Sequence, residues 1–162
     1  GKGAEALRGL EREYPVAMGY LADADRAAQG SNDLRTHGGR LVRMSSTNVN
    51  EMSDRDARSR AAARGRYGRN AMVQGAAAEF FKMWAVLMRA RSGDLAARIV
   101  LCLHDELLIH VPEAHAHAAA ELLDRCLQET AHRWAPTNNR GVQPVRFVSD
   151  TTVIHHWSEA KG

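Results

Sequence analysis

The sequence predicts an α+β fold, with helices in the first part of the chain and strands concentrated in the second. Apolar residues recur at spacings of three and four through residues 3–29, and a second helical pattern covers residues 53–91. Two apolar runs then enclose three polar residues, and a helix and another apolar run follow. This order indicates helices followed by a β-β-α-β arrangement.

Residues 3–44 are predicted to form a helical segment and a small hairpin. Pro15 separates two helices or kinks one, because proline lacks the amide donor and its ring collides with the preceding turn. Residues 34–44, interrupted by two glycines, predict the hairpin, and residues 45–52 predict a polar loop.

Residues 53–91 are predicted to form two successive helices. Ser53 is a favourable N-cap, and acids follow it in the first turn. The first helix is expected to end near Tyr67 and the second to run from about Asn70 to Arg91. Large apolar side chains surround the second helix, so we expect it to be deeply packed.

The remaining residues predict a buried hairpin, a helix and a strand. Arg98–Leu103 and Leu107–Val111 are the expected paired strands, and residues 142–148 are a further strand. A helix of about residues 113–134 is expected to place four apolar residues on its inner side, namely Leu122, Leu123, Cys126 and Leu127.

The composition excludes several classes of protein. The 162 residues are 44% hydrophobic and 25% charged, as in an ordinary globular domain. No apolar run is long enough to span a bilayer and no signal peptide is apparent, so no membrane partner is expected. Two isolated cysteines do not make a disulfide framework, which favours the cytoplasm. Cys102 is expected to be a small buried residue.

A cluster of arginines indicates a polyanion partner such as nucleic acid. The net charge is only +3, but six arginines lie within fifteen residues: Arg55, Arg58, Arg60, Arg64, Arg66 and Arg69. A solvated helix face explains this block equally well.

Arg66, Asn70 and Gln74 are spaced by four residues, which places them on one face of a continuous helix. We call this row the ladder. All three side chains donate hydrogen bonds, and every base pair offers N3 or O2 acceptors in the minor groove. Gly75 and the three alanines after it would allow close approach of a backbone or another helix. The alternative is that these three residues are ordinary polar residues of an amphipathic helix and bind no DNA.

His104, Asp105 and Glu106 separate the two apolar runs of the second hairpin. Adjacent carboxylates repel each other, and a divalent cation such as Mg²⁺, which takes carboxylate oxygens, is the usual compensation. The tip is therefore a candidate metal-assisted active site. A charged, solvated turn is the alternative.

Together these motifs resemble the C-terminal part of family A DNA polymerases, the bacterial DNA polymerase I type. Two blocks carry the resemblance, Arg66-xxx-Asn70-xxx-Gln74-Gly75-xx-Ala78 and the run from Val100 through His104-Asp105-Glu106 to Leu107. Supporting similarities are the Leu10 to Pro15 helix, Thr36-xx-Gly39-Arg40, and the tail around Ser149 and Trp157. Departures from the family pattern are Met72 for Pro, Ala76 for Thr, Glu79 for Asp and Leu103 for Val.

The resemblance implies that the chain is a fragment of a polymerase. Residues 1–60 of the chain would form part of the fingers subdomain, and residues 61–162 part of the palm subdomain. The family's D-Y-S-x-I-E-L-R segment and its nucleotide-binding helix do not occur in this sequence. The missing N-terminal part of the polymerase is therefore an expected partner. The implied location is the bacterial cytoplasm, in association with the nucleoid.

The implied activity is template-directed nucleotidyl transfer by a DNA-directed DNA polymerase with two Mg²⁺ ions. Asp105 would be one of two catalytic aspartates that hold the metals, and Glu106 an auxiliary carboxylate. One metal lowers the pKa of the primer 3′-hydroxyl, and the other orients the deoxynucleoside triphosphate and its leaving group.

The implied DNA contacts involve primer-template DNA. His104 would contact the primer strand, the ladder residues Arg66, Asn70 and Gln74 would grip the minor groove, and Arg40 would touch the DNA backbone. We expect the fragment to be inactive alone. The alternatives are a non-catalytic module that binds duplex DNA and a metal-dependent phosphodiesterase. The second is disfavoured because the other histidines lack metal-site spacing such as HExxH.

Overall fold

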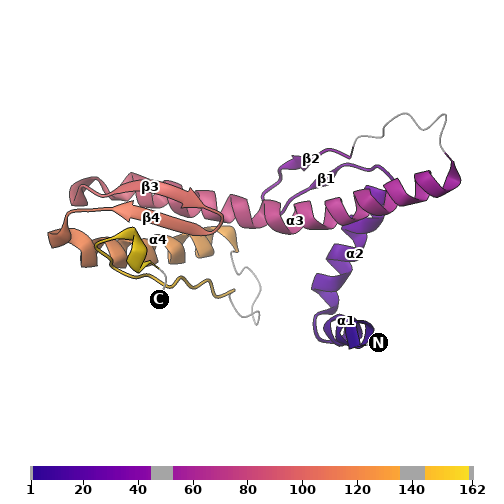
Figure 1. The fold of residues 1–162 in the computed structure, drawn as a ribbon, viewed down its shortest axis with the longest axis horizontal. Coiled ribbons are helices and arrows are strands. Elements are labelled where there is room, and N and C mark those ends of the chain that lie inside the picture. The colour runs from indigo at the N-terminus through magenta and orange to yellow at the C-terminus, as the bar shows by residue number, and fades with distance from the viewer. Residues whose placement is uncertain (1, 45–52, 136–144, 161–162) are drawn as a thin grey trace. The chain divides into compact units, whose positions relative to one another are not determined.

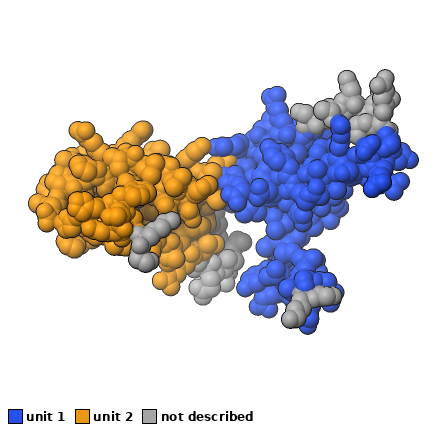
Figure 2. Space-filling model, viewed as in Figure 1, with its two compact units in different colours: residues 1–76 blue, residues 77–162 orange. Residues whose placement is uncertain are grey.

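The computed structural model describes residues 2–44, 53–135 and 145–160. These residues form four α-helices and two small antiparallel hairpins (Figure 1). This confirms the predicted α+β class. The chain divides into two compact units, residues 1–76 and residues 77–162, which Figure 2 distinguishes by colour.

Unit 1 begins with the helices α1 (Lys2–Glu13) and α2 (Pro15–Gln29). Pro15 is the first residue of α2, where its missing amide hydrogen costs no hydrogen bond, so the predicted break is confirmed. The strands β1 (Leu34–Arg35) and β2 (Leu41–Val42) pair antiparallel and form the predicted small hairpin. The predicted loop at 45–52 lies outside the described residues.

The helix α3 (Asp54–Arg91) is continuous over 38 residues and contributes to both units. The Ser53 hydroxyl accepts a hydrogen bond from the Asp56 amide at 3.3 Å, which confirms the predicted N-cap. The predicted division between Tyr67 and Asn70 is wrong. Gly68 in this stretch does not end the helix. It allows α2 to approach, because a Cβ at Gly68 would lie 2.5 Å from the Cβ of Ala28.

A small core holds unit 1 together. Its buried members come from α2, the hairpin and α3, namely Ala24, Ala28, Leu34, Met44 and Met72. The two members from α2, Ala24 and Ala28, have short side chains, so α2 packs with its backbone close to its neighbours. Residues with little or no side chain at the contact make this spacing possible.

Unit 2 is built around the second hairpin and the helix α4 (Ala116–Trp134). The strands β3 (Arg98–Leu103) and β4 (Glu106–His110) pair antiparallel. The 3-10 turns of this unit are η1 (Gly93–Leu95), η2 (Glu113–His115) and η3 (Trp157–Glu159). The strand β4 begins and ends one residue earlier than the strand predicted at Leu107–Val111.

The core of unit 2 joins α3 to α4. All four residues predicted on the inner side of α4 are buried, and Trp84 and Met88 of α3 complete the cluster. The indole nitrogen of Trp84 donates a hydrogen bond of 2.9 Å to the Leu123 carbonyl. This satisfies the polar atom of a buried aromatic side chain. Burial also raises the pKa of the Cys126 thiol above its usual value.

The hairpin of unit 2 is more exposed than predicted. Ile99, Leu107 and Ile109 pack on the α3–α4 core. In contrast, Val100, Leu101 and Leu103 are 56%, 40% and 45% exposed, and Cys102 is exposed rather than buried. The reason is that a two-stranded sheet packs one face on the helices, while β3 has no second neighbouring strand among the described residues.

The predicted last strand is wrong for its described part, because residues 145–148 form no strand. Phe147 instead stacks on Phe80, with ring centroids 4.1 Å apart and an interplanar angle of 18°. The side chain of Gln128 also donates to the Phe147 carbonyl at 3.4 Å. The segment is thus held by ring stacking and a side-chain hydrogen bond. Within the described ranges, no helix has the length and apolar character needed to cross a bilayer.

Candidate functional site

The predicted polar tip is a two-residue loop at the end of the second hairpin. His104 and Asp105 form the loop, and Glu106 is the first residue of β4, paired with Leu103. All three polar side chains are exposed. His104 has a φ of 52°, in the left-handed region that residues other than glycine rarely adopt.

The backbone of this loop follows from hairpin geometry. The favoured two-residue loops require positive φ so that the turn matches the twist of the strands. Glycine would adopt this conformation without steric cost, whereas a left-handed residue with a Cβ costs roughly 1–2 kcal/mol. Such an outlier supports a hypothesis that the His104 side chain has a function.

The loop and strand end present two adjacent carboxylates, Asp105 and Glu106, to solvent. Their oxygens are the ligand type that Mg²⁺ prefers. The residues described here contain no group of three or more His, Cys, Asp or Glu side chains that could hold a metal ion. The pair therefore fits part of a magnesium site, and further ligands would have to join it.

The ladder lies on α3 in unit 1, and the carboxylate loop lies in unit 2. Arg66, Asn70 and Gln74 are all exposed and occupy one uninterrupted stretch of helix. They therefore share a helix face. The expected grip of these three residues on the minor groove stays a prediction.

Two arginines of the basic block have structural partners within unit 1. Arg64 donates hydrogen bonds to the carbonyls of Ala28 and Gln29, at 3.4 and 3.0 Å. Both carbonyls lie in the last turn of α2, and that of Ala28 also accepts from the Ser31 amide. The Arg69 guanidinium lies 3.9 Å from the Asp25 carboxylate. These two residues link α2 to α3, so part of the block has a structural role, and the polyanion interpretation of the block stays a prediction.

Arg40 lies in the first hairpin and is exposed. Its backbone amide donates to the Thr36 hydroxyl at 3.0 Å, which fixes the turn that carries it. A groove of about 660 Å³ lies between the hairpin and α3, with Arg40, Arg43 and Tyr67 on its sides. The sequence analysis missed Arg43 and Tyr67. The local signal for Tyr67 is Arg66 directly before it, and Arg43 lies three residues after Arg40.

The model of DNA polymerase family A matches residues 2–157. DNA polymerase I from Thermus thermophilus is 28% identical over 128 residues, which cover 77% of this chain and 15% of that protein. DNA polymerase theta from Caenorhabditis elegans is 41% identical over 59 residues, which cover 36% of this chain and 4% of that protein.

The solved structures include a similar chain, the POL domain of Pol1 from M. smegmatis in complex with DNA primer-template and dNTP. It matches with a TM-score of 0.56 and 28% sequence identity, over 70% of this chain and 19% of that one. The chain therefore spans less than a fifth of the polymerases it matches.

Proposed function

The chain belongs to DNA polymerase family A, and on that basis we propose that it forms the C-terminal part of a template-directed DNA polymerase. In this proposal residues 1–60 belong to the fingers and residues 61–162 to the palm. The remainder of the polymerase supplies the other catalytic aspartate. Residues 1–162 have no polymerase activity by themselves.

The observation that carries the proposal is the loop at the end of the second hairpin. It exposes two consecutive acidic residues, Asp105 and Glu106, to solvent, directly after a histidine in a left-handed conformation. In the proposal Asp105 is a metal ligand, Glu106 is an auxiliary carboxylate, and His104 contacts the primer strand. A bound magnesium pair would activate the primer 3′-hydroxyl and orient the triphosphate.

The ladder supports a role in holding the duplex. Arg66, Asn70 and Gln74 are exposed hydrogen-bond donors on one face of a continuous helix. Acceptors recur at similar minor-groove positions for every base pair, so such a row can hold any sequence. Primer-template DNA and deoxynucleoside triphosphates are the proposed partners, as in the complex of the mycobacterial relative. The proposal includes a bacterial cytoplasmic, nucleoid-associated location; the relatives are DNA polymerase I of Thermus thermophilus and also DNA polymerase theta of Caenorhabditis elegans.

Primer extension by the full gene product tests the role of Asp105. Replacing Asp105 by Asn keeps the size of the side chain but removes the charge that a metal ion requires. Nucleotide incorporation should fall by on the order of a thousandfold, which corresponds to several kcal/mol. The control is Asp94→Asn, which removes another exposed acid of unit 2. Equal rates for both variants would contradict the assignment.

Replacing Gln74 by Ala in the same protein tests the ladder. The variant loses a hydrogen bond worth roughly 1 kcal/mol, so the affinity for primer-template DNA should fall about fivefold. Ser59→Ala changes another exposed polar residue of α3 and should leave the affinity unchanged. Duplex binding that depends on Gln74, without any incorporation, would favour the alternative of a non-catalytic module.

A further inference from the structure

The strand β3 contains a β-bulge between the base of the second hairpin and the carboxylate loop. Six residues of β3 face five residues of β4, and the register shifts between Ile99 and Leu101. The partners of these two residues on β4 are the consecutive residues Ile109 and Leu108. Val100 is therefore the extra residue. Such a residue is left unpaired, bends its strand and increases the local twist, and bulges are common beside active sites.

The bulge divides β3 into a packed part and an exposed part. Ile99, before the bulge, packs on the α3–α4 core. In a regular strand Leu101 and Leu103 would share its face, because alternate residues point to the same side. Both are instead exposed, and Leu103 pairs with Glu106 at the start of β4. The loop is thus carried by the part of the hairpin that packs least on the helices.

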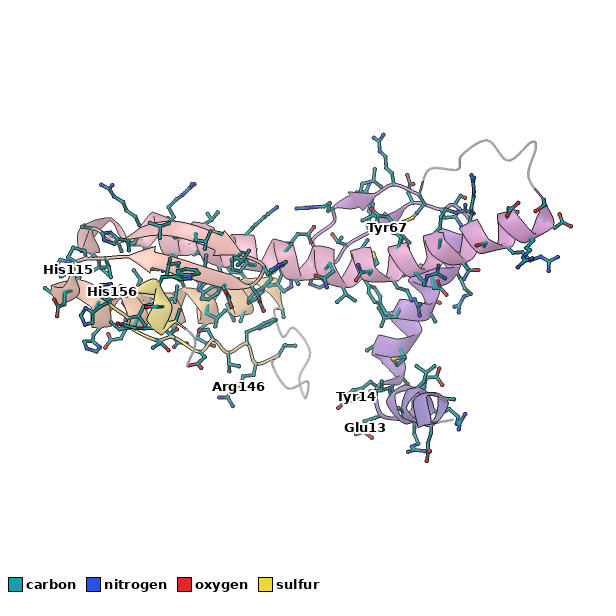
Figure 3. The ribbon with its side chains drawn as sticks, in the orientation of Figure 1. Glu13, Tyr14, Tyr67, His115, Arg146 and His156 are labelled. Atoms are coloured by element: carbon teal, nitrogen blue, oxygen red, sulfur yellow. The ribbon has the colours of Figure 1, made fainter. Side chains whose placement is uncertain are left out.

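The base of this hairpin is fixed on both strands. Before β3, the buried Ser92 hydroxyl donates to the Ala97 carbonyl at 3.2 Å. After β4, Nδ1 of His115 donates to the Leu95 carbonyl at 3.0 Å, which ties η2 to η1. Figure 3 shows His115 beyond the end of β4, at the opposite end of the hairpin from the loop. Because the base is fixed, the bend at Val100 determines the direction in which the loop projects.

We propose that the bulge at Val100 positions the Asp105 and Glu106 carboxylates for metal binding. Catalytic groups must be held within about 0.5 Å of the productive geometry, and both of these side chains are exposed, so the backbone must supply that precision. Val100 is a positioning residue that acts through the bend of its strand. The inference rests on the proposed function, because it assumes that this loop binds the magnesium ions.

Deleting Val100 from the full gene product tests the proposal. Its side chain is 56% exposed, and it lies outside the paired positions of the hairpin. The deletion therefore makes the pairing regular and keeps every residue pair, every core contact and the loop sequence. The fold should persist, whereas the bend that directs the loop is lost.

Four measurements on the deletion variant separate positioning from folding. In primer extension kcat should fall by about a hundredfold, the effect of misplacing a catalytic group by about 1 Å. Calorimetry with Mn²⁺, a cation that carboxylates also bind, should show an affinity about tenfold weaker for the complex with primer-template DNA. The Kd for primer-template DNA and the Tm should stay close to those of the wild type, because neither the ladder nor the core is changed.

Two substitution variants complete the test. Val100→Gly removes the same side chain as the deletion but keeps the extra backbone residue, which glycine accommodates in a bulge. It should retain kcat and the affinity for Mn²⁺. Val100→Leu combined with Leu101→Gly keeps the length of β3 and moves the unpaired position one residue towards the loop. It should lose both properties, and it replaces the deletion in the test if the deletion variant does not fold.

The outcomes distinguish this proposal from the one on which it rests. Wild-type kcat and Mn²⁺ affinity in a folded variant without the bulge, or with the bulge moved, would overturn it. An equal loss in Val100→Gly would also overturn it, because the side chain and not the bulge would then be responsible. In either case a loss of incorporation in Asp105→Asn would still support the proposed function. If Asp105→Asn extends primers as the wild type does, both proposals fail.

Discussion

Gly68 lies within a helix of 38 residues, where glycine costs about 1 kcal/mol relative to alanine. The contact with α2 explains why it is there. A Cβ at this position would lie 2.5 Å from the Cβ of Ala28 and 3.3 Å from the Ala24 carbonyl oxygen. Both neighbours belong to the helix α2, and neither is the end of a flexible side chain. The glycine is therefore a packing residue.

Replacing Gly68 by Ala should destabilise unit 1, although alanine favours helix. The overpacking cost of about 1–3 kcal/mol exceeds the gain in helix propensity of about 1 kcal/mol. The matched control is Gly19→Ala, because nothing lies within 4 Å of the Cβ at that helical position, and it should stabilise the protein. Urea unfolding followed by circular dichroism measures both changes. A Gly68→Ala variant as stable as Gly19→Ala would rule out the close contact.

The candidate site residues differ in how far the sequence around them reveals their role. Asp105 and Glu106 stand out because two carboxylates interrupt an apolar pattern, and the structure places both in solvent at the end of the hairpin. Arg64 and Arg69 looked like the other arginines of their block. Their partners lie on α2, more than thirty residues earlier, so local sequence could not assign them a structural role. Tyr67 escaped notice because the groove exists only once the hairpin folds onto α3.

At the scale of elements, an ion-pair cluster joins α3 to α4 beside the core of unit 2. Glu129 accepts hydrogen bonds from Arg91 of α3 and from Arg133 of α4, at 2.8 and 2.6 Å. The hydrogen bond from Arg91, with a smaller contribution from Arg133, lowers the pKa of the Glu129 carboxyl below its usual value of 4.5. The ionised form is thus favoured in the folded state.

This cluster predicts a pH dependence with a definite sign. A carboxyl with a lowered pKa in the folded state stabilises the protein above its unfolded pKa, and the stabilisation is lost as the pH falls through the folded pKa. The difference in stability between wild type and Glu129→Gln should therefore be largest near neutral pH and shrink below about pH 4.5. Thermal unfolding at a series of pH values measures it.

The control is Glu121→Gln, which removes an exposed pair with Arg125 on the same helix. Exposed pairs of this kind contribute little, so its stability should stay close to that of the wild type at every pH. A constant difference between wild type and Glu129→Gln across the series would show that the carboxylate charge is not responsible.

An element boundary could be predicted from the sequence where its signal lies within a few residues of it. Pro15 and Ser53 determine helix ends through their own backbone and side-chain chemistry, and both were predicted. The continuity of α3 was not predicted, because Gly68 resembles a helix end until its contact with Ala28 is known. Likewise, Phe147 was assigned to a strand from its apolar neighbours, whereas it stacks on Phe80, far away in the sequence.

At the scale of the whole molecule, the chain is part of a family A DNA polymerase domain. It spans less than a fifth of the polymerases it matches. Within the described residues there is no cluster of three metal-binding side chains, and β3 exposes apolar residues on a strand with one neighbour. We therefore expect the rest of a polymerase to supply further carboxylate ligands and to cover this strand.

Residues 1–162 alone should show no template-dependent nucleotide incorporation above background. The physical reason is that two adjacent carboxylates do not complete the coordination of a metal pair. A primer-extension assay with Mg²⁺ measures this, with the full gene product as the positive control. Efficient extension by residues 1–162 would show that the chain carries every catalytic ligand and would overturn the fragment interpretation.

The sequence by itself determined the α+β class, most of the elements and the polar loop, because these follow from periodicity, capping and interruptions that act within a few residues. Only the tertiary structure decided which polar residues have structural partners, which glycines serve packing, and that β3 is exposed. These properties depend on neighbours that are distant in the sequence. For the same reason the groove beside Tyr67 became visible only when the hairpin and α3 were seen together.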